Sequence, residues 1–314
     1  MFIYQYSPHY QIIKGDIFGT YYSIKIKTDT KDSSLKNQIK QKLDEINSSM
    51  SVFEPDSEIS RINAAPAKQR IELSPSMSKV LKAADKVYWQ SGGFFDPSLG
   101  RLIDLWGFGA SAISNPSADD IKKALQASGF VKLKFAKNFK YITKTNSQIM
   151  LNLSAIAKGW AVDEISALLD NAGYQNYIVE IGGEIKTKGY REGNSEPWIV
   201  GINRPSPDAS DNVLVISLSN MAVATSGNYR NFYSRDGKIL GHTISARTGE
   251  PVVSDVASAT VFHSSCMMAD AYATAIVALG VAEGLTFADK QKLAVIIYDD
   301  QMQQHLSKAA QKMF

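Results

Sequence analysis

The sequence predicts an α+β fold, in which helices and strands are interleaved without a regular β–α–β period. The 314-residue chain is 44% hydrophobic and 21% charged, as is typical of a globular protein with one large domain or two ordinary ones. Amphipathic helical stretches alternate irregularly with short apolar strands. No Gly-x-Gly-x-x-Gly or Gly-x-x-x-x-Gly-Lys-Ser/Thr pattern is present, so the usual Rossmann and P-loop nucleotide sites are not supported.

The first half of the chain favours helices. Residues 21–28 (YYSIKIKT) roughly alternate and predict a strand. Similar patterns predict helices over 75–90 and over 119–128, the latter ending at Gly129, and two short strands within 132–151. Apolar residues at three- and four-residue steps predict an amphipathic helix over 34–50: Leu35, Ile39, Leu43, Ile46 and Met50.

The second half contains more strands. Helices are predicted over 155–172, 268–279 and 282–292, and an apolar run over 293–298 predicts a closing strand. Further short apolar or alternating runs predict strands over 177–180, 185–189, 198–202, 213–218, 222–225 and 257–263.

Composition excludes several classes of protein. The net charge of +3 and the scattered lysines argue against nucleic-acid binding. The single cysteine, Cys266, excludes an internal disulfide and an all-cysteine zinc site, and we expect a buried thiol. No run of eighteen apolar residues predicts a membrane-spanning helix. The N-terminal residues lack the regions of a signal peptide, which fits a cytoplasmic protein or a mature chain without its leader.

Two helices carry residues that are suited to binding ions. Asp270 and Thr274 are four residues apart and share a helix face, so a carboxylate and a hydroxyl could hold a hard cation. Alternatively, Asp270 caps the helix and Thr274 is solvated. Lys158, beside Gly159 in the opening turns of another helix, could meet a phosphate, or it is an ordinary surface lysine.

Other polar and aromatic positions leave two interpretations open. His242 is either a general acid/base or a structural histidine. Gly182-Gly183 is either a tight turn or a close approach to a ligand. Ser226 lacks a Gly-x-Ser-x-Gly context, which argues against a hydrolase nucleophile. Several aromatic residues favour either a core or a slot for a planar ring: Phe53, Phe94, Phe95, Trp106 and Phe108.

Several motifs follow one another along almost the whole chain. They are Gly19-Thr20 before a strand, SVFEPDSEISRIN (51–63), GGFFDPSLGRLIDLWGFG (92–109), LNLSAIAKGWAVDEI (151–165), VEIGGEIKTKG (179–189), AVATSGNYRNF (222–232), HTISARTGEPV (242–252) and ADAYATA (269–275). In this order they resemble the ApbE family, the FAD:protein FMN transferases. The resemblance implies one domain over residues 1–314, of T-fold-like architecture with mixed sheets and packed helices. Within it, we expect residues 1–15 to form a loosely ordered N-terminal arm.

The resemblance also implies an activity and a site. A member of the family transfers FMN from FAD, with Mg²⁺, to a Thr or Ser hydroxyl of a target protein and releases AMP. The metal is held by the Ala155 carbonyl and by Asp270 and Thr274, and His242, Asp270 and Lys158 are the implied catalytic residues. The implied FAD-binding residues are Phe18, Phe53, Phe94, Phe95, Asp96, Asn152, Lys158, His242 and Ile244.

Three positions depart from the family pattern. Asn152 replaces the usual aspartate, Ser245-Ala246 replaces the usual Asp-Pro, and Phe18 replaces the usual methionine. We interpret these departures as tuning of the site.

Two other functions fit the same site: hydrolysis of FAD to FMN and AMP, and FAD binding without catalysis. For a transferase, the resemblance implies that the acceptor is a flavoprotein subunit of a membrane redox system. It further implies a periplasmic or periplasm-facing, membrane-anchored protein, with a lipid anchor in the full-length precursor.

Overall fold

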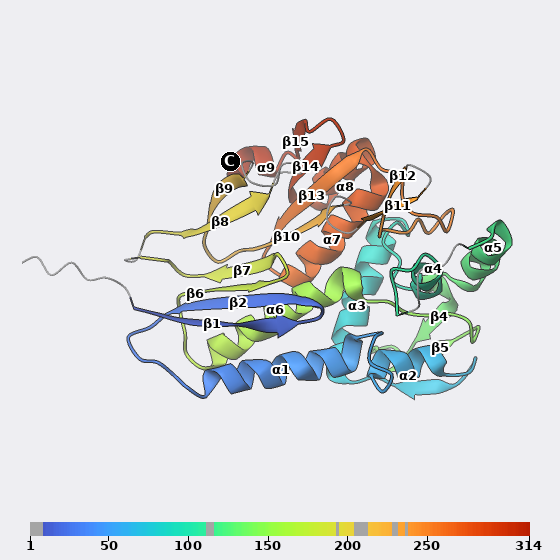
Figure 1. Ribbon diagram of the computed structural model, residues 1–314, viewed down its shortest axis with the longest axis horizontal. Helices are drawn as coiled ribbons and strands as arrows, with labels where there is room; N and C mark the ends of the chain where they lie inside the picture. Colours follow the sequence, from blue (N-terminus) through green and yellow to red (C-terminus); the bar gives the residue numbers. More distant parts are fainter. Residues whose placement is uncertain (1–8, 111–115, 193–194, 204–212, 228–231, 236–237) are drawn as a thin grey trace, which may run out of the picture.

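A large antiparallel sheet forms the centre of the molecule in the computed structural model (Figure 1), which describes residues 9–110, 116–192, 195–203, 213–227, 232–235 and 238–314. Every neighbouring pair of its strands is antiparallel, whereas the resemblance implied mixed sheets. A parallel pairing occurs at the isolated bridge between Leu99 and Met150. In order across the sheet, the strands are β1 (Tyr10–Ile17), β2 (Thr20–Lys27), β6 (Tyr177–Ile181), β7 (Glu184–Lys188), β10 (Ala222–Gly227), β13 (Val256–His263), β14 (Ala294–Asp299) and β15 (Gln304–Leu306).

Helices cover one face of this sheet and enclose the main hydrophobic core. The helix on the outside, α1 (Leu35–Met50), buries the five apolar residues that its spacing predicts. In contrast, α7 (Cys266–Leu279) is apolar on nearly all sides because it lies in the interior. The other helices of this layer are α3 (Pro75–Gln90), α6 (Ser154–Asn171) and α8 (Val281–Gln291).

The opposite face of the sheet is covered in part by a two-stranded ribbon, β8 (Trp198–Asn203) and β9 (Val213–Leu218). Inward-facing residues of the ribbon pack on the sheet and form a second core. The buried residues of this core are Ile185, Val200, Ile202, Ile216, Leu218, Val223, Phe262, Ile296 and Tyr298.

The remaining elements are short. A three-stranded sheet lies on the right in Figure 1, in the order β3-β5-β4, beside small helices. The antiparallel sheet, the helical layer on one of its faces and the β8–β9 ribbon on the other confirm the predicted α+β class. The short elements are α2 (Glu58–Ala64), β3 (Arg70–Glu72), α4 (Gly100–Leu105), α5 (Ala118–Ala127), the 3₁₀ turn Phe130–Lys132, β4 (Leu133–Phe135), β5 (Tyr141–Lys144), β11 (Phe232–Arg235), β12 (Lys238–Gly241) and α9 (Ala310–Met313).

The prediction of a loosely ordered N-terminal arm over residues 1–15 is wrong for residues 10–15. Residues 10–15 belong to β1, which pairs with β2 residue for residue from Tyr10 to Ile17. Phe18 and Gly19 form the connecting turn with φ of 54° and 71°, as a two-residue hairpin requires. Residues 1–8 lie outside the described residues.

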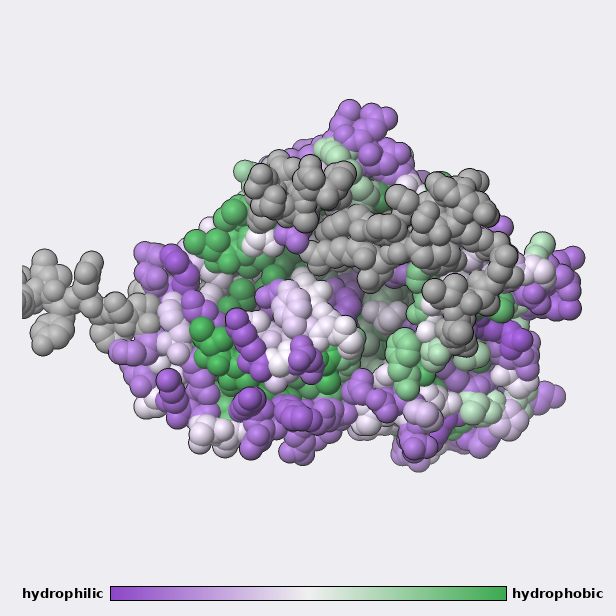
Figure 2. Space-filling model, in the orientation of Figure 1, coloured by the Kyte–Doolittle hydropathy of each residue, from purple (hydrophilic) through white to green (hydrophobic). Residues whose placement is uncertain are grey.

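Hydrophobic residues also reach the surface. Figure 2 shows them grouped on the left of the face in view, over the strands of the large sheet. Ile12, Tyr21, Ile199 and Val215 are large exposed side chains of these strands and of the ribbon. Among the described residues, no helix is long and apolar enough to cross a membrane.

A buried lysine connects the three-stranded sheet to the segment that leads into α6. Lys144 is 0% exposed, and its ammonium donates to the carbonyls of Asn63, Ser147 and Ile149 at 2.6, 3.1 and 3.2 Å. These bonds use all three ammonium donors. Burial lowers the pKa of Lys144. Lys144 therefore fixes the chain just before Asn152.

We predict that Lys144→Met lowers the free energy of unfolding by about 2 kcal/mol, because it leaves three buried carbonyls without their donor. The exposed Lys140→Met is the matched control, with an expected change of about 0.5 kcal/mol or less. Urea denaturation of both variants measures the difference. Equal stability of the two variants would show that the Lys144 ammonium is dispensable.

Candidate active site

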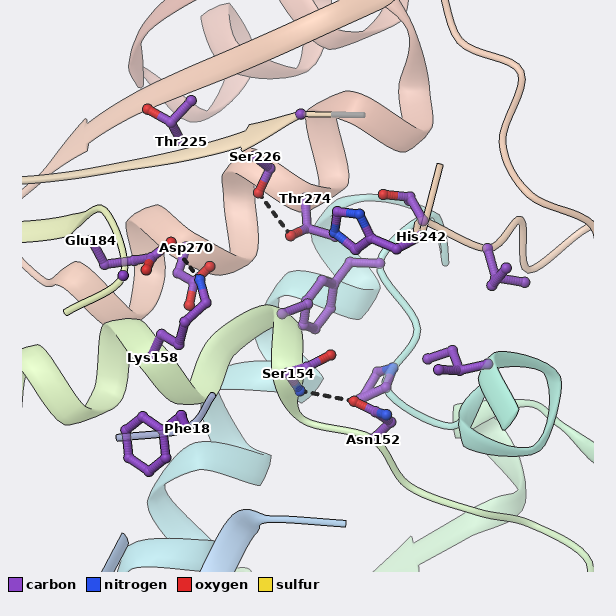
Figure 3. Close-up of a pocket in the computed structure, with 18 of the residues that line it drawn as sticks. Phe18, Asn152, Ser154, Lys158, Glu184, Thr225, Ser226, His242, Asp270 and Thr274 are labelled. Atoms are coloured by element: carbon purple, nitrogen blue, oxygen red, sulfur yellow. Dashed lines mark hydrogen bonds and ion pairs between the residues drawn. The ribbon is translucent and has the colours of Figure 1, made fainter. Parts of the chain in front are cut away.

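The site is a cavity of about 440 Å³ between the sheet and its helices. Residues far apart in the sequence line it: the β1–β2 turn, the segment before α4, the start of α6, the β6–β7 turn, the end of β10, residues 242–244 and α7. Figure 3 shows side chains from these elements converging on one space. Of the residues named from the sequence, the cavity contains Phe18, Phe94, Phe95, Asp96, Asn152, Ala155, Lys158, His242, Ile244, Asp270 and Thr274.

Phe53 does not line this cavity. Its side chain is 64% exposed in the turn after α1, where the Ser51 hydroxyl accepts a hydrogen bond from the Phe53 N–H. The aromatic character of the residue pointed to a buried slot, but the turn directs it to the surface.

The start of α6 forms one wall. Asn152, which is buried, accepts a hydrogen bond from the Ser154 N–H at 2.9 Å through its Oδ1 (Figure 3). An aspartate would accept the same bond, so the departure at Asn152 keeps the local geometry. Ser154, Ala155 and Lys158 of the first helical turns also line the cavity, so the positive end of the helix dipole lies at its wall.

The close crossing of α6 and α7 places Asp270. Gly159 has no side chain, and a Cβ there would lie 2.3 Å from the Cys266 carbonyl oxygen. At this short separation, the Gly159 N–H donates to Asp270 Oδ2 at 3.0 Å. A regular helix directs that N–H to the Ala155 carbonyl, so Asp270 competes with this carbonyl for the donor.

The capping role considered for Asp270 is wrong. Helix α7 begins at Cys266 and its N-cap is Ser265, which accepts from the Met268 N–H. Asp270 therefore lies in the second turn and is only 2% exposed, rather than opening the helix. Burial raises the pKa of the Asp270 carboxyl, and Lys158 and the Gly159 N–H partly oppose this.

We predict that Gly159→Ala lowers the free energy of unfolding by about 2 kcal/mol, because the new methyl group forces the two helices apart. Gly284→Ala in α8 is the milder control, because the atom nearest to a Cβ there is the Ile276 Cγ2 methyl at 3.0 Å rather than a carbonyl oxygen at 2.3 Å, and the expected change is within about 1 kcal/mol. Thermal or urea unfolding measures both. A Gly159→Ala variant as stable as the control would show that the crossing tolerates a larger separation.

Lys158 is not an ordinary surface lysine. Its ammonium lies 2.5 Å from Glu184 Oε1, and the Glu184 side chain is only 3% exposed. Burial lowers the pKa of Lys158, but the charges of Glu184 and Asp270 outweigh it and the net pKa is raised. Burial raises the pKa of Glu184 in turn, and Lys158 opposes the rise.

One half-buried cation therefore lies beside two buried carboxylates. Within the described part of the chain, Glu184 Oε2 accepts no hydrogen bond, so the negative charge of the group is not fully compensated there. Glu184 follows Gly182 and Gly183, whose φ values of 60° and 103° form the β6–β7 turn. The tight-turn interpretation of the glycine pair is confirmed; Gly182 also lines the cavity, and its approach to a ligand stays a prediction.

Thr274 faces the same space one helical turn after Asp270. Its hydroxyl lies 3.1 Å from the Ser226 hydroxyl on β10 (Figure 3). Among the described residues, no three histidine, cysteine or acidic side chains form a metal cluster. A cation at this site would instead rely on one carboxylate, a hydroxyl and a carbonyl, together with water or ligand oxygens.

Two aromatic residues of the segment before α4, Phe94 and Phe95, also line the cavity. Phe95 is 3% exposed, whereas Phe94 is half-buried and the Arg247 guanidinium lies 4.2 Å from its ring centre. Trp106 belongs to a small core, where its Nε1 donates to the Gly249 carbonyl at 2.8 Å. The aromatic cluster thus divides into core residues and residues that line the cavity.

Asp96 mainly holds its own loop. Its Oδ1 accepts from the Ser98 N–H and hydroxyl at 2.8 and 2.5 Å, and its Oδ2 accepts from the Phe130 N–H at 3.3 Å. Burial raises the pKa of this carboxyl, and these hydrogen bonds oppose the rise. The loop that carries Phe94 and Phe95 is fixed in this way.

His242 lines the cavity on the segment after β12. Its ring centre lies 6.4 Å from that of Phe108, in an edge-on arrangement. Ile244 anchors the segment in the small core of α4 and α5. Ser245 Oγ accepts from the N–H groups of Arg247 and Thr248 at 3.2 Å, so a serine forms the turn at the position where the family usually has aspartate.

Sequence reasoning assigned no role to Asp163 or Glu184. Asp163 on α6 accepts from the Ser265 hydroxyl and the Cys266 and Met267 N–H groups, at 2.7 to 3.1 Å, and pairs with Lys186. It thereby caps α7 from the neighbouring helix. Both acids lie inside quoted motifs, but their partners are distant in sequence, so no local pattern indicates their roles.

Comparisons with known proteins point to one family. The sequence model described as "ApbE family" matches residues 18–297. The "FAD:protein FMN transferase" of Vibrio cholerae is 34% identical over 91% of this chain and 86% of that protein, and the one of Haemophilus influenzae is 33% identical over 91% and 85%. The solved "Flavin Transferase ApbE from Vibrio cholerae" superposes with a TM-score of 0.89 at 31% identity, covering 98% of this chain and 99% of the other. The apo flavinyl transferase ApbE of Pseudomonas stutzeri gives 0.89 at 29%, covering 99% and 98%.

Proposed function

Because the chain belongs to the ApbE family, we propose that it transfers FMN from FAD to a Thr or Ser hydroxyl of a target protein and releases AMP. The supporting observation is the single cavity that gathers eleven of the twelve side chains or carbonyls that the family resemblance names. The cavity combines a helix N-terminus, a half-buried lysine and aromatic rings, which suits a dinucleotide with a planar ring system.

The donor atoms fit a magnesium ion. Asp270 is a buried carboxylate whose charge is incompletely balanced, Thr274 supplies a hydroxyl, and Asp270 competes with the Ala155 carbonyl for the Gly159 N–H. All three donors are oxygens, the ligand type that Mg²⁺ prefers. When bound, Mg²⁺ would neutralise charge that develops on the diphosphate. We propose Ala155, Asp270 and Thr274 as its protein ligands.

The protein residues have defined tasks in this reaction. The acceptor oxygen attacks the phosphorus of the FMN half, the bond between that phosphorus and the bridging oxygen breaks, and AMP leaves with the electron pair. A ring nitrogen of His242 accepts the proton of the attacking hydroxyl. Lys158 and the N–H groups at the start of α6 bind phosphate oxygens, and the phenylalanines orient the flavin. Phosphoryl transfer depends mainly on such positioning and electrostatics.

The test is to incubate the protein with FAD, MgCl₂ and a purified acceptor protein, and then to look for flavin fluorescence on the acceptor after denaturing electrophoresis. We expect a fluorescent acceptor band that disappears when the modified Thr or Ser is replaced by Ala. Free FMN without a labelled acceptor would identify a pyrophosphatase, and unchanged FAD would identify a binding protein.

We also propose that the acceptor is a flavoprotein subunit of a membrane redox system, and that the mature protein acts on the periplasmic side, with a lipid anchor in its precursor. Only the family resemblance supports this. Fractionation of cells that express the full-length precursor tests the proposed location, because recovery in the cytoplasmic fraction alone would contradict it.

A further inference from the structure

A pair of hydroxyl groups connects the sheet to α7 at the proposed metal site. Ser226 lies at the end of β10 and Thr274 lies in the middle of α7, and their oxygens are 3.1 Å apart. Both residues line the cavity, and Figure 3 shows the bond between them at its upper wall, close to Asp270. Either oxygen could be the donor.

The chemistry of a metal ligand decides the direction of this bond. A hydroxyl oxygen that ligates a cation gives it a lone pair, so its single proton must be directed to another acceptor. A cation on the Thr274 oxygen also polarises its O–H bond and makes it a stronger donor, and the Ser226 oxygen lies 3.1 Å away as an acceptor. We infer that Ser226 accepts the Thr274 proton and is therefore a positioning residue for the metal. This inference rests on the proposed function, since it takes Thr274 as a ligand.

The other protein side-chain ligand is fixed independently. Asp270 accepts from the Gly159 N–H and therefore takes its orientation from α6. Thr274 takes its orientation from β10, through Ser226. Outer groups that orient a metal ligand typically change metal affinity by about 10- to 100-fold when they are removed.

A neighbouring hydroxyl pair provides a matched control. Thr225 and Thr260 lie opposite each other on β10 and β13, with their oxygens 2.9 Å apart. Thr260 is buried and does not line the cavity. Thr260→Val thus removes a hydroxyl from the next position of the same strand pair without changing Ser226 or Thr274.

The experiment titrates the full protein with Mn²⁺, and the electron paramagnetic resonance signal of free Mn²⁺ reports binding without turnover. Ser226→Ala is expected to weaken Mn²⁺ binding about 10- to 100-fold, whereas Thr260→Val is expected to bind like the wild type. Thr274→Val is expected to weaken binding as well. Adding Ser226→Ala to Thr274→Val should cause no further loss, because Ser226 acts through Thr274.

The outcomes separate this inference from the proposed function. If the wild-type protein binds no Mn²⁺, or if Asp270→Asn binds Mn²⁺ with the same affinity as the wild type, the proposed metal site is overturned and the inference with it. If Asp270→Asn loses the ion while Ser226→Ala binds like the wild type, only the role of Ser226 is overturned. Independent, additive losses in Ser226→Ala and Thr274→Val would also overturn it.

Discussion

Replacing Asp270 by asparagine is expected to lower the rate of FMN transfer by at least about a thousand-fold, because electrostatic stabilisation by a bound metal contributes several kcal/mol to such a reaction. Asp270 is the only charged residue among the three proposed ligands. The asparagine oxygen can still accept from the Gly159 N–H, so the helix crossing is preserved. The buried site therefore loses its charge while it keeps its shape.

Transfer rates at saturating MgCl₂, together with thermal unfolding in EDTA, measure the effect of Asp270→Asn. Its unfolding temperature in EDTA should stay close to that of the wild type. Asp44→Asn makes the same chemical change on the surface of α1, where Asp44 pairs with Lys40, and should transfer FMN at the wild-type rate. Asp270→Asn activity within tenfold of wild type, or wild-type transfer that survives in EDTA, would contradict the proposed metal site.

Replacing His242 by alanine is expected to lower the transfer rate by at least about a hundred-fold, the usual contribution of a general base. FAD affinity should change only a few-fold, because the phosphates and the flavin have other partners. Ile244 and the turn at Ser245 hold the segment independently of the imidazole, so the fold should be retained.

Single-turnover transfer and FAD binding, measured separately, distinguish catalysis from binding in His242→Ala. His9→Ala removes an imidazole that is 75% exposed beside Asp29, outside the cavity, and should behave as the wild type. A loss of FAD affinity that accounts for the whole rate effect would assign His242 to binding alone.

Local patterns predicted the long helices well, but they missed the edge strand β1 and the short helices. The bounds of α3 agree with the prediction, since its apolar spacing and the proline at its start are local signals. Strand β1 was missed because Ile12 and Ile13 interrupt the alternation and only its pairing with β2 reveals it. Short helices such as α2 and α4 contain too few turns for a periodic signal.

The residues of the site were predictable, but their interactions were not. The motif order pointed to Lys158, Asp270 and Thr274, which the fold brings to one cavity. Their partners Glu184 and Ser226 lie on strands β7 and β10, far away in sequence. Burial and pairing of this kind depend on tertiary contacts, so they follow only from the structure.

The central claim is that the phosphorus of FMN is transferred to a protein hydroxyl rather than to water. The ratio of AMP released to flavin covalently bound on the acceptor tests this most directly, with AMP measured by chromatography and bound flavin by absorbance of the denatured acceptor. The account predicts one AMP for each flavin attached, and little AMP when the acceptor is omitted. AMP released in large excess over bound flavin, at the same rate with or without the acceptor, would contradict it.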